Sequence, residues 1–172
     1  LGVWAARRAR KWDGVAITVL SQIGIAIPSF LAAILLVAWF AVRLKWVPAN
    51  GWSVPSEDFG GFVARLILPV ISLGIVQAAI MTRYVRSAVL DVMDEDFMRT
   101  ARAKGLSPGQ ALMAHGLRNA ALPVLTVTGL QITNLLIGAV VIEKVFVIPG
   151  LGSMLLQAVT DRDLPTVQTI VM

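Results

Sequence analysis

The 172-residue chain contains no cysteine and only one histidine, His115. The absence of cysteine excludes a disulfide, a thiolate nucleophile and a zinc–thiolate site, and a single histidine excludes a multi-histidine metal site. A phosphate-binding loop is also missing, because Lys104 precedes Gly105 and no Gly-Lys-Ser/Thr sequence follows it. Ser153 follows Gly-Leu-Gly but is not part of a G-x-S-x-G sequence. We therefore predict a protein that is not an enzyme, holds no metal or cofactor, and cannot hydrolyse ATP alone.

Charged residues are scarce too, at 15% of the chain, whereas 57% of the residues are hydrophobic and the mean hydropathy is +0.79. The apolar residues form long blocks, which is typical of a membrane protein and not of a soluble core. The net charge of +5 and the pI of about 10.5 would suggest a nucleic-acid partner in a soluble domain. Here the cations flank apolar runs, so membrane lipid and topology explain them better, and we predict no nucleic-acid partner.

The first long apolar run covers residues 14–42. As one helix it would be about 43 Å long, against roughly 30 Å of hydrocarbon, so we expect either a tilt or a bend at Pro28. Small and polar residues fall on one side of that helix: Gly14, Thr18, Ser21, Gln22 and Ser29. Such a stripe either packs against another helix or lines a water-filled path, and packing is the favoured interpretation.

Two further crossings are predicted over residues 62–81, which include Pro69, and 120 to about 142. The last of these has a polar face for which packing and pore lining both stay open: Thr128, Gln131, Asn134 and Gly138. From residue 167 the chain begins an apolar segment too short to cross. We expect an all-α polytopic membrane domain over residues 1–172, cut from a longer chain at both ends.

The segment of residues 94–119 is a charged stretch between apolar runs. Three acidic residues, 94–96, suit the start of a helix over 97–104, and Gly105 stands where a left-handed cap would end it. Ser107 and Pro108 then predict the N-terminus of a second short helix that runs to about Asn119. We expect a projecting handle of two short helices joined by a glycine turn.

Lys and Arg are distributed unevenly among the connecting segments. Residues 1–13 and 82–118 together hold ten, whereas residues 43–65 and 143–165 hold five. The positive-inside rule then places the 94–119 segment in the cytoplasm, and the loops of residues 43–61 and 143–165 outside. Tryptophans 46 and 52 in the first outer loop suit a membrane interface.

Residues 100–107 (TARAKGLS) and 115–123 (HGLRNAALP) resemble the EAA loop of ABC-importer permeases, and more narrowly that of the dipeptide, oligopeptide and nickel permease family. Thr100 stands where the general motif has glutamate, and Leu122-Pro123 comes five residues later than in the general pattern. Further matching stretches follow the family's order along almost the whole chain: residues 27–30, 46–51, 143–152 and 162–165.

This resemblance implies a type I importer permease domain in a bacterial or archaeal cytoplasmic (inner) membrane. It implies a sister permease, two cytoplasmic ATP-binding subunits that hold ATP and Mg, and an extracytoplasmic substrate-binding protein. The residues expected to couple to the ATPase are Arg99, Thr100, Ala101, Arg102, Ala103, Lys104, Gly105, Leu106, Met113 and His115. The outer-loop residues that match the family are Glu143, Pro149, Gly150 and Gly152. The substrate stays open among peptides, nickel, glutathione and related solutes.

Two other classes of function make different predictions. A membrane-embedded enzyme needs paired ionisable residues at membrane depth, and the three apolar runs offer only Arg65, near one edge. A passive channel or structural membrane subunit would work without an ATPase, so purification without any ATPase subunit would favour it.

Overall fold

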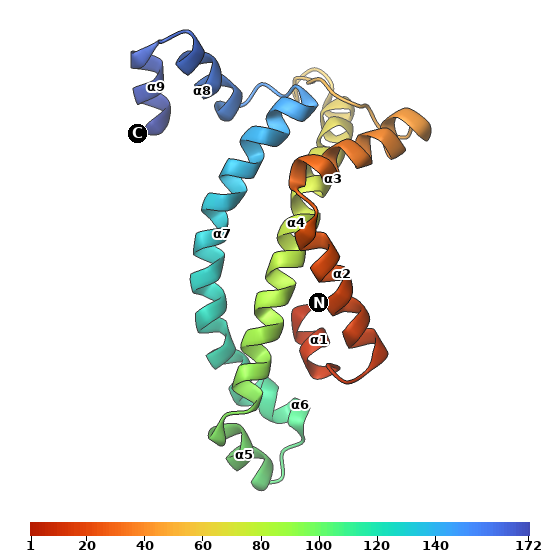
Figure 1. Ribbon diagram of the computed structural model, residues 1–172, viewed down its shortest axis with the longest axis vertical. Coiled ribbons are helices and arrows are strands. Elements are labelled where there is room, and N and C mark those ends of the chain that lie inside the picture. The colour runs from red at the N-terminus through yellow and green to blue at the C-terminus, as the bar shows by residue number, and fades with distance from the viewer. The chain divides into compact units, whose positions relative to one another are not determined.

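The computed structural model describes residues 1–172 and is helical, with no β-strand (Figure 1). This confirms the all-α class. The helices are α1 (Gly2–Arg7), α2 (Trp12–Ala26), α3 (Ser29–Leu36), α4 (Phe59–Met93), α5 (Asp96–Ala103), α6 (Pro108–Ala111), α7 (Leu117–Phe146), α8 (Leu151–Thr160) and α9 (Leu164–Val171). Two π-helical stretches are η1 (Val37–Arg43) and η2 (Leu112–Gly116).

The chain forms two compact units. Unit 1 comprises Leu1–Ala26 and Val76–Thr133, and unit 2 comprises Ile27–Ile75 and Asn134–Met172. The long helices α4 and α7 contribute to both units, because each of them contains one of the boundaries.

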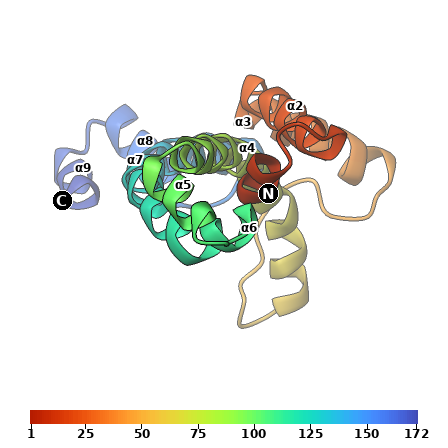
Figure 2. The same cartoon turned by 90° about the horizontal axis from the view of Figure 1, so that it is seen from below.

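Each unit has its own apolar core. The core of unit 1 consists of Ala6, Ala88, Val89, Met98, Ala101, Ala111, Leu112 and Ala120. The core of unit 2 consists of Ala33, Leu68, Ile142 and Phe146. Seen from below, α1, α5 and α6 lie around the unit 1 ends of α4 and α7 (Figure 2).

Two helical segments are long and apolar enough to cross a membrane: α4, with 35 residues, and the continuous run Pro108–Phe146, with 39. At 1.5 Å per residue they measure about 52 and 58 Å, well beyond roughly 30 Å of hydrocarbon. The crossings predicted over residues 62–81 and 120–142 therefore lie inside longer helices, and both predicted sets of bounds were too short. Few residues in the apolar windows of these helices are buried, 17% in α4 and 11% in the run Pro108–Phe146, which suits a lipid surrounding.

The first apolar run is not one helix, because α2 ends at Ala26 and α3 begins at Ser29. Pro28 causes this break, since it lacks a backbone N–H and disfavours helical geometry at the preceding residue. The bend is thus confirmed, and the pair of helices forms a third candidate crossing. The predicted stripe from Gly14 to Ser29 was wrong as a single face, because Ser29 belongs to another helix.

Candidate functional site

Helix α5 divides sharply into a buried and an exposed face. Met98 and Ala101 are buried in the core of unit 1, where Val89 of α4 also lies. Ala101 is 7% exposed and therefore offers a partner very little surface, although the sequence placed it among the coupling residues. The rest of the predicted set on this helix is exposed: Arg99, Thr100, Arg102, Ala103 and Lys104. One face anchors the helix, and the other exposes charged side chains, among them the ion pair of Arg99 with Asp96 at 3.2 Å.

The predicted left-handed cap at Gly105 is confirmed, with φ of +95°. The Gly105 N–H donates to the carbonyl of Arg102 at 3.0 Å, and the Leu106 N–H donates to that of Ala101 at 3.3 Å. This pair of bonds is a Schellman motif, in which an apolar residue after the glycine packs back on the helix. Leu106 does so, since it is half-buried against the core of unit 1.

The predicted second N-terminus is present as a capping box. The Ser107 hydroxyl accepts a hydrogen bond from the Gln110 N–H at 3.4 Å, and the Gln110 side-chain oxygen accepts one from the Ser107 N–H at 3.0 Å. Pro108 occupies the first helical position, where its missing N–H costs nothing. The chain therefore turns from α5 into α6 within four residues by local bonding alone.

The sequence predicted that the second short helix would end near Asn119, and this prediction was wrong. Helix α6, η2 and α7 follow one another without a gap up to Phe146. The reason is burial: Leu112, Leu117, Ala120 and Val124 all pack into or against the core of unit 1 across the predicted boundary. Two separate handle helices are thus absent, and the 94–119 segment is α5 plus the first turns of a membrane helix.

An open depression lies between α5 and η2. Its lining combines one cation with apolar and polar groups: Phe97, Thr100, Ala101, Lys104, Leu106 and His115. Met113 of η2 is 63% exposed. Apolar groups next to the exposed Lys104 ammonium suit a protein partner that offers apolar and acidic groups.

The polar residues on the membrane helices mostly bond to their own helix. The Ser21 hydroxyl donates to the carbonyl of Ile17 at 2.8 Å, and that of Thr128 to the carbonyl of Val124 at 2.7 Å. Ser21 and Gln131 are buried. The other polar residues predicted to line the pore or pack between helices are more exposed: Gln22, Ser29, Thr128 and Asn134. Pore lining at these positions stays a prediction.

In unit 2, α7 packs closely against its neighbours at Gly138. A Cβ added there would lie 3.3 Å from Leu73 of α4 and 3.9 Å from the Ser29 hydroxyl of α3. Close approach at a small residue is the usual chemistry of helix contacts in membranes. Gly138 and Ser29 are therefore packing positions in this unit.

Glu143 belongs inside α7, which continues to Phe146, so the predicted helix end at residues 143–144 was too early. Its carboxylate accepts a hydrogen bond from the Ser153 N–H at 2.7 Å and so caps the first turn of α8 from another helix. Its partner is thus internal. A Cβ on Gly150 would lie 2.2 Å from this carboxylate, and one on Gly152 2.5 Å from Val140. Pro149, which directly precedes Gly150, is exposed.

Sequence reasoning missed this internal partner of Glu143. The sequence signal was the spacing of Glu143 from Gly150 and Gly152, the two glycines on either side of the first residue of α8. It also missed α1, in which Ala5 and Ala6 are buried and Ala6 lies in the core of unit 1.

A helical chain with two or three candidate membrane-crossing segments and a capped turn that carries exposed cations has the features of a membrane transport subunit. The chain belongs to the family described as binding-protein-dependent transport system inner membrane component, whose family model matches residues 1–172. It is a multi-pass membrane protein of a transport system.

Individual relatives show which proteins of this family the chain resembles. The chain is 44% identical over 169 residues to a putative peptide transport system permease protein of Brucella suis biovar 1, covering 98% of this chain and 54% of the relative. It is 41% identical over 167 residues to the dipeptide transport system permease protein DppB of Bacillus subtilis, covering 97% and 52%. It is 40% identical over 171 residues to the oligopeptide transport system permease protein AppB of the same species, covering 98% and 54%. The chain spans about half the length of the curated relatives it matches.

These matches confirm the resemblance to ABC-importer permeases. The three relatives are named for peptides, dipeptides and oligopeptides, and none of the three is named for nickel.

Proposed function

We propose that this chain is the membrane core of a permease subunit of an ATP-driven peptide importer. In this proposal it forms half of a translocation pore together with a sister permease. Two cytoplasmic ATP-binding subunits hold ATP and Mg, and an extracytoplasmic binding protein delivers the substrate. The observation that carries the proposal is the division of α5 into an anchored apolar face and an exposed charged face, on which Arg99 pairs with Asp96 while Arg102 is in no ion pair.

The anchoring explains how the 94–119 segment can transmit force. Met98 and Ala101 of α5 share one core with Val89 of α4 and with Leu112, just before α7. Well-packed cores do not deform continuously, so a partner that moves α5 must move its neighbours with it. Both α4 and α7 then extend from unit 1 into unit 2.

The charge distribution supports the proposed orientation. Unit 1 holds ten Lys or Arg and five Asp or Glu, whereas unit 2 holds five of each, so the whole excess of +5 lies in unit 1. Both segments predicted to be cytoplasmic, residues 1–13 and 94–119, belong to unit 1. Residues 43–61 and 143–165 belong to unit 2. A cytoplasmic unit 1 agrees with the positive-inside rule.

The peptide assignment rests on the names of the relatives. Selection would lie largely with the extracytoplasmic binding protein. Uptake of labelled dipeptides, nickel and glutathione by cells that carry the complete transporter would separate the candidates, and uptake of nickel alone would overturn the assignment.

Site-directed labelling tests the orientation. Arg102→Cys and Arg162→Cys are introduced singly into a cysteine-free full-length permease and treated with a membrane-impermeant maleimide. We expect Arg162→Cys to react in intact cells, and Arg102→Cys only in inside-out vesicles. Reaction of Arg102→Cys from outside would overturn the proposal. Purification of an active permease without any ATPase subunit would favour a passive channel instead.

A substitution at Gly105 tests the turn. A β-branched residue strongly resists the left-handed region, so Gly105→Val should cost roughly 1–2 kcal/mol at the Schellman motif and reduce substrate-stimulated ATPase activity of the assembled transporter. Nothing lies within 4 Å of an added Cβ there, so any effect comes from the backbone alone. Gly105→Asn is the matched control, because asparagine tolerates this conformation better. Equal activity of both variants and the parent protein would show that the turn does not transmit coupling.

A further inference from the structure

The turn between α1 and α2 holds a cluster of cations beside an apolar helix. Helix α1 folds back onto the start of α2 so closely that a Cβ on Gly14 would lie 2.1 Å from the Arg8 carbonyl oxygen. The turn itself carries Arg8, Arg10 and Lys11. Both helices belong to unit 1.

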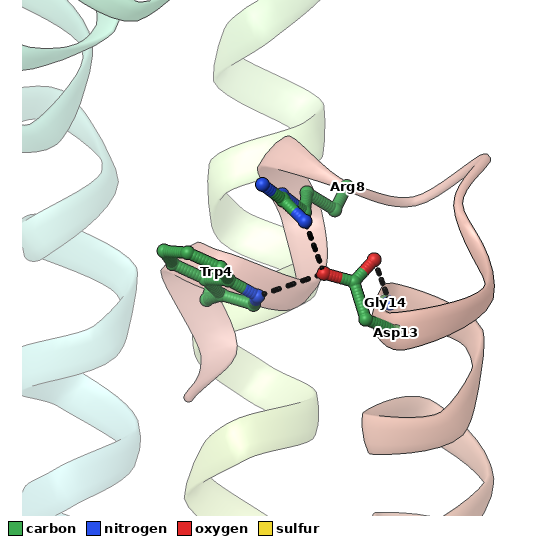
Figure 3. A network of polar contacts seen from close by, with 4 residues as sticks. All are labelled: Trp4, Arg8, Asp13 and Gly14. Carbon is green, nitrogen blue, oxygen red and sulfur yellow. Dashed lines mark hydrogen bonds and ion pairs between the residues drawn. The ribbon is translucent and has the colours of Figure 1, made fainter.

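Asp13, the only carboxylate side chain of residues 1–26, is paired with Arg8 (Figure 3). Asp13 accepts from the Arg8 guanidinium at 2.6 Å, from the Trp4 indole N–H at 3.3 Å and from the Gly14 N–H at 3.0 Å. The Arg8 guanidinium also lies over the Trp4 ring, 4.7 Å from its centroid. This network stabilises the turn, and the Asp13 carboxylate compensates the positive charge of Arg8.

Three cations of the turn region keep their charge available. Arg7, Arg10 and Lys11 are exposed and form no ion pair. Arg10 and Lys11, together with Trp12, line one end of an open groove that continues along α2 past Val15, Val19 and Leu20. Trp12 is 84% exposed and Leu20 67%, so the groove is apolar and uncovered in this chain.

We propose that this groove binds an anionic phospholipid, with its phosphate on Arg10 and Lys11 and an acyl chain along α2. A free anion would need only the cations, whereas a phospholipid also uses the apolar continuation. Tryptophan at the junction of the two is the usual residue of a membrane interface, and basic clusters next to a crossing helix attract anionic lipid. That the lipid belongs to the inner leaflet rests on the proposed orientation.

Arg7 does not line the groove. It lines a second depression with Trp4, Arg8 and Lys11. Its guanidinium lies 2.9 Å from the position that a Cβ of Gly109 would take, and Gly109 is the second residue of α6. The phosphate site is therefore confined to Arg10 and Lys11.

Native mass spectrometry tests the site on the delipidated full-length permease with its partner subunits. The complex is titrated with phosphatidylglycerol and, separately, with phosphatidylcholine. Each cation near an anionic headgroup contributes about fivefold in affinity, so the double variant R10Q/K11Q should weaken phosphatidylglycerol binding about 30-fold. Phosphatidylcholine binding should stay unchanged.

Unit 2 offers a matched control. Arg43 and Lys45 are exposed cations followed by the 71% exposed Trp46, in the same order as Arg10, Lys11 and Trp12. The double variant R43Q/K45Q should leave the tightest phosphatidylglycerol binding unchanged. Equal loss in both double variants, or no loss in R10Q/K11Q, would overturn the site.

A competition arm separates lipid from free anion. Soluble glycerol 3-phosphate at the same concentration should not displace phosphatidylglycerol, and displacement would overturn the acyl-chain part of the proposal. Detergent exposes both faces of the membrane domain, so this measurement does not depend on sidedness. Failure of the lipid site and failure of the proposed orientation therefore give different results.

Discussion

Leu112→Ala should lower the free energy of unfolding by about 2–5 kcal/mol, the usual cost of removing a fully buried leucine side chain. Leu112 has no exposed surface, and it lies in the core of unit 1 with Met98, Ala101 and Val89. Its loss leaves a cavity where α5, η2 and α4 meet. Denaturant unfolding of the purified full-length permease in detergent measures the change, and the substrate-stimulated ATPase activity should fall with it.

The neighbouring residue is the matched control for Leu112. Met113 is 63% exposed, so Met113→Ala should change the unfolding free energy by no more than about 0.5 kcal/mol. If Met113 contacts the ATPase, as the sequence predicts, its replacement should still reduce ATPase stimulation. A Leu112→Ala variant as stable as Met113→Ala would contradict the shared core.

Gly152→Ala should destabilise the junction of α7 and α8 by about 1–3 kcal/mol, as overpacking of a close contact does. The added methyl group would lie 2.5 Å from one Val140 methyl group and 2.9 Å from the other. The valine side chain is short and stiff, so α8 itself must shift. Its shift would also lengthen the bond from the Ser153 N–H to Glu143. The loss of stability is measured by thermal unfolding, or by the rate of proteolysis in the loop between α7 and α8.

A double-mutant cycle isolates this contact. Val140→Ala removes both close methyl groups and should restore part of the stability lost in Gly152→Ala. Gly129→Ala serves as the control on the same long helix, because nothing lies within 4 Å of an added Cβ there. Additive effects of Gly152→Ala and Val140→Ala would show that the two residues do not touch.

The glycine turn at Gly105 was predictable because its bonding is local. A Schellman motif and a capping box use atoms within a few residues of each other, so Gly105, Ser107 and Gln110 carry the instruction in their own order along the chain. The long apolar runs predicted membrane helices for a similar reason, since a backbone in hydrocarbon must satisfy its own hydrogen bonds.

The three prolines of the apolar runs show where local reasoning ends. Pro28 breaks the helix, whereas Pro69 and Pro123 lie inside α4 and α7. The missing N–H is the same in all three, so the difference comes from the surroundings. Pro69 is buried and Pro123 is exposed, so burial of the proline itself does not decide the outcome either. Packing of neighbouring helices can hold a helix together across a proline in a membrane.

Helix α1 and the partner of Glu143 were out of reach for a related reason. A helix of six residues is too short to be stable alone, and α1 is held by the packing of Ala6 against residues distant in sequence, such as Ala88 and Val89. Glu143 meets the N-terminus of α8 only because α7 continues past it and the chain turns back at Gly150.

By itself the sequence determined the all-α membrane class, the capped turn at Gly105 and the uneven distribution of charge, because each follows from composition or from neighbours along the chain. Only the tertiary structure decided where the long helices α4 and α7 begin and end, which face of α5 is buried, and that the 94–119 segment joins α7 without a break. Those features depend on burial between residues far apart in sequence, and burial energies are set by contacts that no local pattern specifies.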